Sequence, residues 1–175
     1  MRAQAFWPEG TNIGWGALIG IGYPTDDAYD PFRRSWDLGP PPGRTYPPFH
    51  DGGPEVRTGG GAEMARFILE DLPEFLAGHL RLDPRRQSLF GHSFGGLFAL
   101  WLLFTRPEAF STWIAASPAI TWEDSFVLDH LKAFDPAGRS LAVHLSAGEW
   151  EGDELAPFQR DRADSAERLA QKSQT

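Results

Sequence analysis

The feature that most constrains the fold is the pentapeptide at residues 91–95, GHSFG, which has the pattern G-x-S-x-G. The preceding residues 87–91, QSLFG, are a candidate for a short strand, and residues 94–104 are apolar nearly all round, as in a buried helix. A serine at a sharp strand-to-helix turn has its hydroxyl raised above the sheet, where it can act as a nucleophile. Small residues at 91 and 95 suit the close chain approach in such a turn. The pattern therefore predicts Ser93 as a nucleophile and the Phe94 amide as an oxyanion donor.

Strand and helix patterns alternate along the rest of the chain. Further short apolar runs at residues 15–22, 112–116 and 141–146 predict strands, the first of them buried. Two more helices are expected, one from residue 61 that Pro73 would kink or divide, and one over residues 157–172. The apolar stripe of the first comprises Ala65, Ile68, Leu69, Leu72 and Leu76, and one face of the second carries Ala163, Ala166 and Ala170. This alternation predicts an α/β fold, a single domain over residues 1–175 with a mostly parallel sheet and helices on both faces.

Residues 37–61 interrupt this pattern. Thirteen of these twenty-five residues are glycine or proline, which is too many for regular secondary structure. A loop of this length inside a domain is usually a functional lid or a disordered segment.

Composition excludes several functions. The 16 basic and 24 acidic side chains give a formal net charge of −8, and no dense basic run exists, so nucleic acid is not an expected partner. Without cysteine there can be no disulfide, thiolate nucleophile or iron–sulfur cluster. We predict no metal site and no cofactor, because no Asp/His cluster has ligand spacing. No apolar run approaches the about 20 residues that span a bilayer, and residues 1–4 lack a signal-peptide pattern, so a cytoplasmic location is expected.

Several segments in series resemble one known family. LFGHSFGGLFALWLLFTRPEAF and AASPAITW, together with IGIGYP, RRSWDLGPPP and TGGGAEMARFILEDL, are similar in order to the esterase-D-like, siderophore-esterase branch of the α/β-hydrolases, which includes enterobactin and salmochelin esterases. The resemblance covers roughly residues 13–172. It implies a partial α/β-hydrolase fold without the first strands and the last strand. It also implies hydrolysis of a small-molecule ester, of the siderophore class, through an acyl-serine on Ser93.

The resemblance also bears on the rest of the catalytic triad. It implies that the acid lies in the turn at residues 148–151, with Glu151 as the best match and Glu149 as the alternative; both can instead be solvated loop carboxylates. The triad order in this fold is serine, acid, histidine, yet no histidine follows Glu151. Of the five histidines, only His50 is predicted to lie in a loop long enough to reach Ser93. Residues 1–14 also lack the family's oxyanion strand, which would leave an unfilled slot in the sheet. We therefore expect little or no ester hydrolysis from this polypeptide alone.

Three residues are candidates for ligand binding. By the resemblance, Arg33, Arg34 and Trp122 belong to segments near the mouth of the active site, where charge and stacking could hold an acidic or catechol-rich ligand. Alternatively, the arginines are surface charges and Trp122 is a packing residue. Two other interpretations stay open besides an esterase: a non-enzymatic binding module, and a degraded or mis-started gene.

Overall fold

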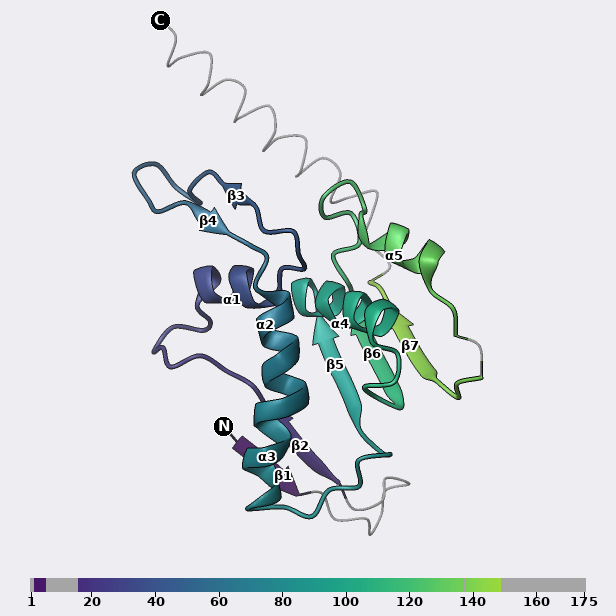
Figure 1. The fold of residues 1–175 in the computed structure, drawn as a ribbon. Coiled ribbons are helices and arrows are strands. Elements are labelled where there is room, and N and C mark those ends of the chain that lie inside the picture. Colours follow the sequence, from purple (N-terminus) through teal and green to yellow (C-terminus); the bar gives the residue numbers. More distant parts are fainter. Residues whose placement is uncertain (1, 6–15, 137, 149–175) are drawn as a thin grey trace, which may run out of the picture. The chain divides into compact units, whose positions relative to one another are not determined.

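The structure is a computed structural model that describes residues 2–5, 16–136 and 138–148 (Figure 1). The chain divides into two compact units, residues 1–60 and residues 61–175, which are described separately below. That the whole chain forms one domain stays a prediction.

The second unit is built on a parallel three-stranded sheet. Its strands β5 (Ser88–His92), β6 (Thr112–Ala116) and β7 (Ala142–Ser146) lie in the order β5-β6-β7. Gly91 is paired with Ala115, and Ala115 with Leu145. The strands expected at residues 87–91, 112–116 and 141–146 are confirmed to within a residue or so at their ends.

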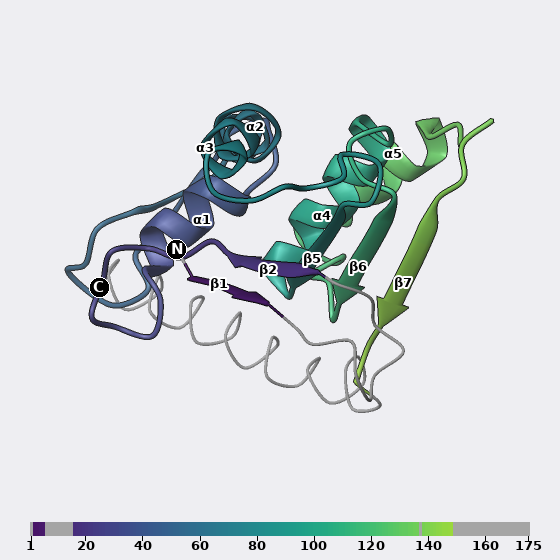
Figure 2. The same ribbon diagram turned by 90° about the horizontal axis from the view of Figure 1, so that it is seen from below.

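Two helices connect these strands and lie on the same side of the sheet. They are α4 (Phe94–Thr105) and α5 (Val127–Ala133), and Figure 2 shows both above the strands. Because both crossovers advance in the same direction along the sheet, the same handedness puts both helices on one face. Leu97 and Leu102 of α4 and Trp113 of β6 are at most 1% exposed, so the core of this unit lies between helix and sheet. The prediction of a buried helix after residue 93 is confirmed.

The opposite face of the sheet carries Phe90, Ile114 and His144 in one row across the strands. In the part of the chain that the structure describes, Phe90 is 62% exposed. The helix predicted over residues 157–172 lies outside the described residues, and helical cover of this second face stays a prediction.

The amphipathic helix expected from residue 61 is present in three continuous pieces: α2 (Gly61–Arg66), a π-helical turn η1 (Phe67–Asp71), and α3 (Leu72–Ala77). Of the predicted stripe, Ala65, Ile68, Leu72 and Leu76 are buried. Pro73 has no N–H to donate, and immediately before it the N–H of Leu72 bonds to the carbonyl of Phe67, five residues back. The expected division at Pro73 therefore takes the form of a π-turn.

The first unit contains a small antiparallel ladder in which β1 (Arg2–Ala5) pairs with β2 (Ala17–Gly20). One expectation is wrong here. The strand within residues 15–22 is not buried, since Leu18 is 57% exposed. Residues 2–5 form the short strand β1, which is not the long β-branched run of the family's oxyanion strand. The apolar run specified an extended backbone but not what would cover it, and β1 forms without a β-branched residue because the ladder satisfies its backbone polar groups.

The remainder of the first unit is α1 (Pro31–Leu38) followed by a two-stranded ladder of β3 (Thr45–Tyr46) and β4 (Val56–Arg57). The expectation that residues 37–61 hold no regular structure is therefore wrong in part. Helix α1, which the sequence reading missed, begins at the N-cap Asp30 with Pro31 in its first turn, and it ends before the prolines at 40–42. Within the described ranges, no helix is long and apolar enough to span a membrane.

Candidate active site

Ser93 occupies the junction between the end of β5 and the first residue of α4. Its φ of 56° and ψ of −117° lie outside the regions that L-residues prefer. Such a conformation costs energy and persists only where the surrounding structure enforces it. The sharp strand-to-helix turn that the G-x-S-x-G pattern predicts is therefore present, while the catalytic role of Ser93 stays a prediction.

Two glycines make this turn sterically possible. A Cβ on Gly91 would collide with the carbonyl oxygen of Gly95 and would lie 2.8 Å from the nitrogen of Gly96. A Cβ on Gly96 would lie 2.9 Å from the Cα of Pro118, in the segment that follows β6. The turn is thus packed directly against backbone on both sides, which leaves no room for a side chain at either position.

Main-chain hydrogen bonds fix Ser93 from three directions. Its N–H donates to the carbonyl of Ala116, the last residue of β6, at 2.9 Å. Its carbonyl accepts from Leu97 in α4 at 3.0 Å and from Ala119 at 3.1 Å. The serine therefore sits where the carboxyl ends of two neighbouring parallel strands meet, which is the usual position of ligands in open α/β sheets.

Phe94 follows the serine and begins α4. Its backbone amide lies at the positive end of the helix, where negative charge is favoured. Its ring is buried, with 7% of the residue exposed, and meets the ring of Trp122 edge-on, with 5.0 Å between centroids and 71° between planes. The structure thus brings together three residues that sequence reasoning selected: Ser93, Phe94 and Trp122.

No histidine ring among the described residues is hydrogen-bonded to Ser93. His92 is exposed beside it at the end of β5, and His144 is exposed on β7. His79 contacts the carbonyl of Phe75 through Nδ1 at 2.9 Å, and the His130 ring packs against Phe126 at 5.8 Å. His50, whose Nδ1 lies 3.5 Å from the carbonyl of Asp51, belongs to the other unit.

The predicted acid cannot be placed, because Glu151 and its alternative Glu149 lie outside the described residues. Within the described ranges, no three His, Asp or Glu side chains gather in a way that could hold a metal ion.

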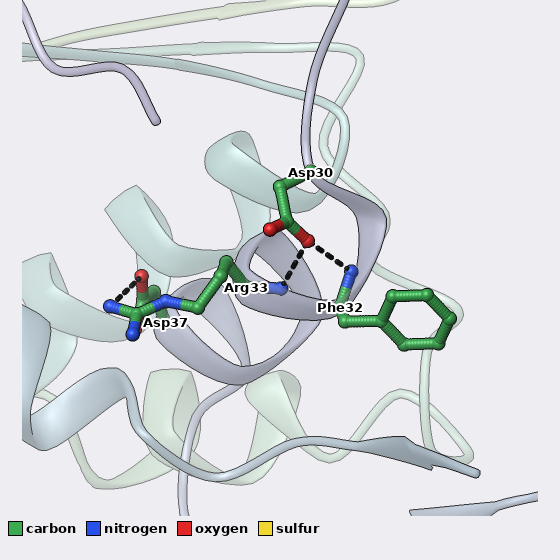
Figure 3. Close-up of polar contacts among 4 residues, drawn as sticks. All are labelled: Asp30, Phe32, Arg33 and Asp37. Atoms are coloured by element: carbon green, nitrogen blue, oxygen red, sulfur yellow. Dashed lines mark hydrogen bonds and ion pairs between the residues drawn. The ribbon is translucent and has the colours of Figure 1, made fainter. Parts of the chain in front are cut away.

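Arg33 and Arg34 lie on α1 in the first unit. Figure 3 shows the polar contacts of Arg33 with Asp37 and of Asp30 with the start of the helix. Asp30 caps the helix by accepting from the amides of Phe32 at 3.0 Å and Arg33 at 2.9 Å. The Arg33 guanidinium donates from Nη2 to Oδ2 of Asp37 at 3.3 Å while 65% of its side chain stays exposed. Arg34 lies over the ring of Tyr29, 5.7 Å from its centroid. Whether either arginine contacts a ligand stays a prediction.

Sequence reasoning missed two residues of this cluster, Asp37 and Tyr23. Asp37 is buried, and burial of Tyr23 together with the charge and hydrogen bond of Asp37 raises the pKa of Tyr23 to about 12. The i,i+4 spacing of Arg33 and Asp37 was a readable signal of an ion pair. The approach of Tyr23, from an irregular segment, had no local signal.

Comparison with known proteins agrees with this geometry. The Esterase family model matches residues 16–175. Among curated relatives, ferri-bacillibactin esterase BesA of Bacillus subtilis is 36% identical over 175 residues, which are 97% of this chain and 60% of that protein. The siderophore enterobactin esterase of Emericella nidulans is 45% identical over 140 residues, 76% of this chain and 44% of that protein. The chain thus spans about half the length of these relatives.

Solved structures give the same result. The BES protein from Bacillus cereus has a TM-score of 0.74 at 32% identity, covering 93% of this chain and 62% of that one. Siderophore hydrolase EstA from Aspergillus nidulans has a TM-score of 0.66 at 37% identity, covering 89% and 57%. The fold is accordingly a partial α/β-hydrolase fold. With a family match over most of its length and a serine held at a strand-to-helix turn, this chain belongs to the Esterase family.

Proposed function

We propose that this chain carries the nucleophilic centre of a serine ester hydrolase, with Ser93 as the nucleophile. The observation that carries the proposal is the backbone conformation of Ser93 between β5 and α4, with φ 56° and ψ −117°. Ser93 Oγ attacks the ester carbonyl carbon, and the bond to the leaving alcohol then breaks to give an acyl-serine and the free alcohol. Water then attacks the acyl-serine, which releases the acyl group as a carboxylic acid and returns the hydroxyl of Ser93. The Phe94 amide stabilises the oxyanion that forms in both steps.

The proton on Ser93 Oγ needs an acceptor for this reaction to be fast. The family pattern assigns that task to a histidine oriented by an acid, which we propose to be Glu151. The last histidine of the sequence is His144, which precedes Glu151. We therefore propose that this polypeptide alone hydrolyses esters slowly, since the loss of triad members typically costs a factor of ~10⁴–10⁶ in rate.

The proposed substrate class is a siderophore ester. Support comes from the names of the relatives, which are esterases of ferri-bacillibactin and of siderophores. The exposed guanidinium of Arg33 and the neighbouring Arg34 supply positive charge for an acidic or catechol-rich ligand in a chain whose net charge is −8.

The test measures Ser93-dependent hydrolysis of a nitrophenyl ester and of a ferric siderophore ester. We expect slow turnover that Ser93→Ala abolishes and that Ser111→Ala, a serine at the opposite end of the sheet, leaves intact. A fluorophosphonate probe followed by peptide mass spectrometry should place the adduct on Ser93. Turnover that is the same in Ser93→Ala and in the wild type would refute the nucleophile assignment, and turnover at ordinary enzymatic rates would refute the proposed slowness.

A second candidate function is ligand binding without catalysis. It is favoured by the anchoring of Arg33, whose guanidinium is held by Asp37 while most of the side chain stays open to solvent. Calorimetry with a ferric siderophore should then give heat that Arg33→Gln reduces. No heat at high ligand concentration would dispose of this candidate.

A further inference from the structure

The segment that follows β6 forms a closed ring of contacts with the serine turn. Ala119 donates its N–H to the carbonyl of Ser93 at 3.1 Å, and the carbonyl of Ala119 accepts from the N–H of Trp122 at 3.1 Å. The Trp122 ring meets the ring of Phe94, the residue bonded covalently to Ser93. The resulting closed set of contacts consists of two hydrogen bonds, one aromatic contact and one peptide bond. It joins Ser93, Ala119, Trp122 and Phe94.

Further contacts hold the segment after β6 in place. The carbonyl of Ala116 accepts from the N–H of Ser93, and Pro118 lies against Gly96 in the first turn of α4. The N–H of Ser117 donates to the carbonyl of Ser146 at 2.7 Å, which attaches the segment to β7. Hydrogen bonds therefore join the segment after β6 to the ends of both neighbouring strands, β5 and β7.

The segment also holds backbone conformations that L-residues avoid. Ser117 has a φ of 44°, and the three consecutive residues Glu123, Asp124 and Ser125 have φ values of 53°, 54° and 63°. Such conformations persist where contacts enforce them, and here they flank the stretch that ends at Trp122. The indole ring is therefore carried by a stretch of chain with left-handed backbone conformations at both of its ends.

We propose that Trp122 is a positioning residue that holds the Phe94 amide and the Ser93 turn in their reactive geometry. Because the buried Phe94 ring packs against the indole, this contact restrains the Cα of Phe94, to which the proposed oxyanion donor N–H is attached. This role rests on the proposed function and differs from the predicted one, in which Trp122 stacks on a ligand.

The test follows the backbone amide protons of the residues in this closed set of contacts. Hydrogen exchange measured by NMR reports on the hydrogen bonds donated by Ser93, Ala119 and Trp122 residue by residue. Trp122→Ala should speed exchange at Ser93 and Ala119 by about tenfold or more, while Trp122→Phe, which keeps an aromatic edge for Phe94, should restore protection to within about threefold. Trp36→Ala, which removes a half-buried indole from the other unit, is the matched control and should leave these amides unchanged.

Global unfolding in urea, measured for each variant, separates local loosening from loss of the fold. If Trp122→Ala does not fold, Trp122→Leu replaces it, since leucine fills space but has no aromatic edge; the proposal then requires faster exchange in Trp122→Leu than in Trp122→Phe. Unchanged protection of Ser93 and Ala119 in a folded Ala or Leu variant would overturn the proposal.

Kinetics distinguish the two roles of the indole. A positioning role lowers kcat for Ser93-dependent hydrolysis with little change in KM, whereas a ligand-stacking role raises KM and leaves amide exchange as it was. If the wild type shows neither Ser93-dependent hydrolysis nor a fluorophosphonate adduct on Ser93, the proposed function fails, and amide exchange still decides whether Trp122 holds the turn.

Discussion

The Ser93 turn and the arginine cluster of α1 were both selected from the sequence, yet they are held in different ways. Ser93 is fixed by main-chain hydrogen bonds to Ala116, Leu97 and Ala119, and glycines leave room for the backbone to pass. Arg33 is held by one carboxylate, and most of its side chain lies in solvent. A site made of backbone is specified by glycine spacing, whereas a site made of side chains depends on which partners its charged groups meet.

The largest change in stability is expected from a substitution in the Ser93 turn. Gly91→Ala places a methyl group against the Gly95 carbonyl, so we expect destabilisation of about 3 kcal/mol, at the upper end of typical overpacking costs. Urea unfolding measures it. The control is Gly20→Ala in β2, where nothing lies within 4 Å of the added carbon and a change below about 0.5 kcal/mol is expected. Equal midpoints for the two variants would contradict this account of the turn.

A smaller effect should follow from the side-chain site. Asp37→Asn removes the charge that pairs with Arg33 and interacts with the Tyr23 hydroxyl, so we expect a loss of about 1.5–2 kcal/mol, at the lower end of the range for hydrogen bonds to charged groups. The pKa of Tyr23 should also fall, though not fully to its ordinary value, because burial remains. Ultraviolet titration of the phenol measures the shift. A Tyr23 pKa that stays at about 12 in the variant would show that Asp37 is not its cause.

The same contact predicts a dependence on pH. The folded state holds the Tyr23 pKa at about 12 against an ordinary value of 10.0, so between these values the unfolded chain loses the proton while the folded chain keeps it. Stability is therefore fully present below about pH 10 and falls as the pH rises towards 12. Urea midpoints at pH 8 and pH 10.5 should differ more in the wild type than in Tyr23→Phe. The same difference in both proteins would assign the effect to other groups.

The smallest effect is expected at Arg33 itself. Arg33→Gln removes an ion pair whose cationic partner is 65% exposed, and such pairs contribute about 0–1 kcal/mol. Stability should change less than in Asp37→Asn, because Gln leaves the Asp37 carboxylate in contact with Tyr23. A larger loss in Arg33→Gln would mean that the guanidinium, and not the carboxylate, organises the cluster.

The second unit was largely predictable because its signals are local. Residues 112–116 and 141–146 are short apolar runs, and α4 is apolar on every side, so the hydrophobic pattern alone indicated their structure. The serine turn was readable for the same reason, since its glycines and its serine all lie within residues 91–96.

The first unit was less predictable because its structure depends on contacts that the local pattern does not contain. The run at residues 15–22 predicts a strand. Its pairing with β1 and its exposure depend on tertiary contacts, which the local pattern does not contain. Helix α1 has a readable cap at Asp30, although the prolines beyond it obscured the signal. The Tyr23–Asp37 contact joins an irregular segment to a helix, and no periodicity could have indicated it.

The approach of Pro118 to Gly96 links two positions that are far apart in the chain. Since the proline Cα occupies the space into which any side chain at 96 would extend, a larger residue there is tolerable only where the backbone at 118 withdraws. Across relatives, these two sites are therefore expected to vary as a pair. Such paired substitution would indicate that the loop after β6 and the helix after Ser93 evolve together.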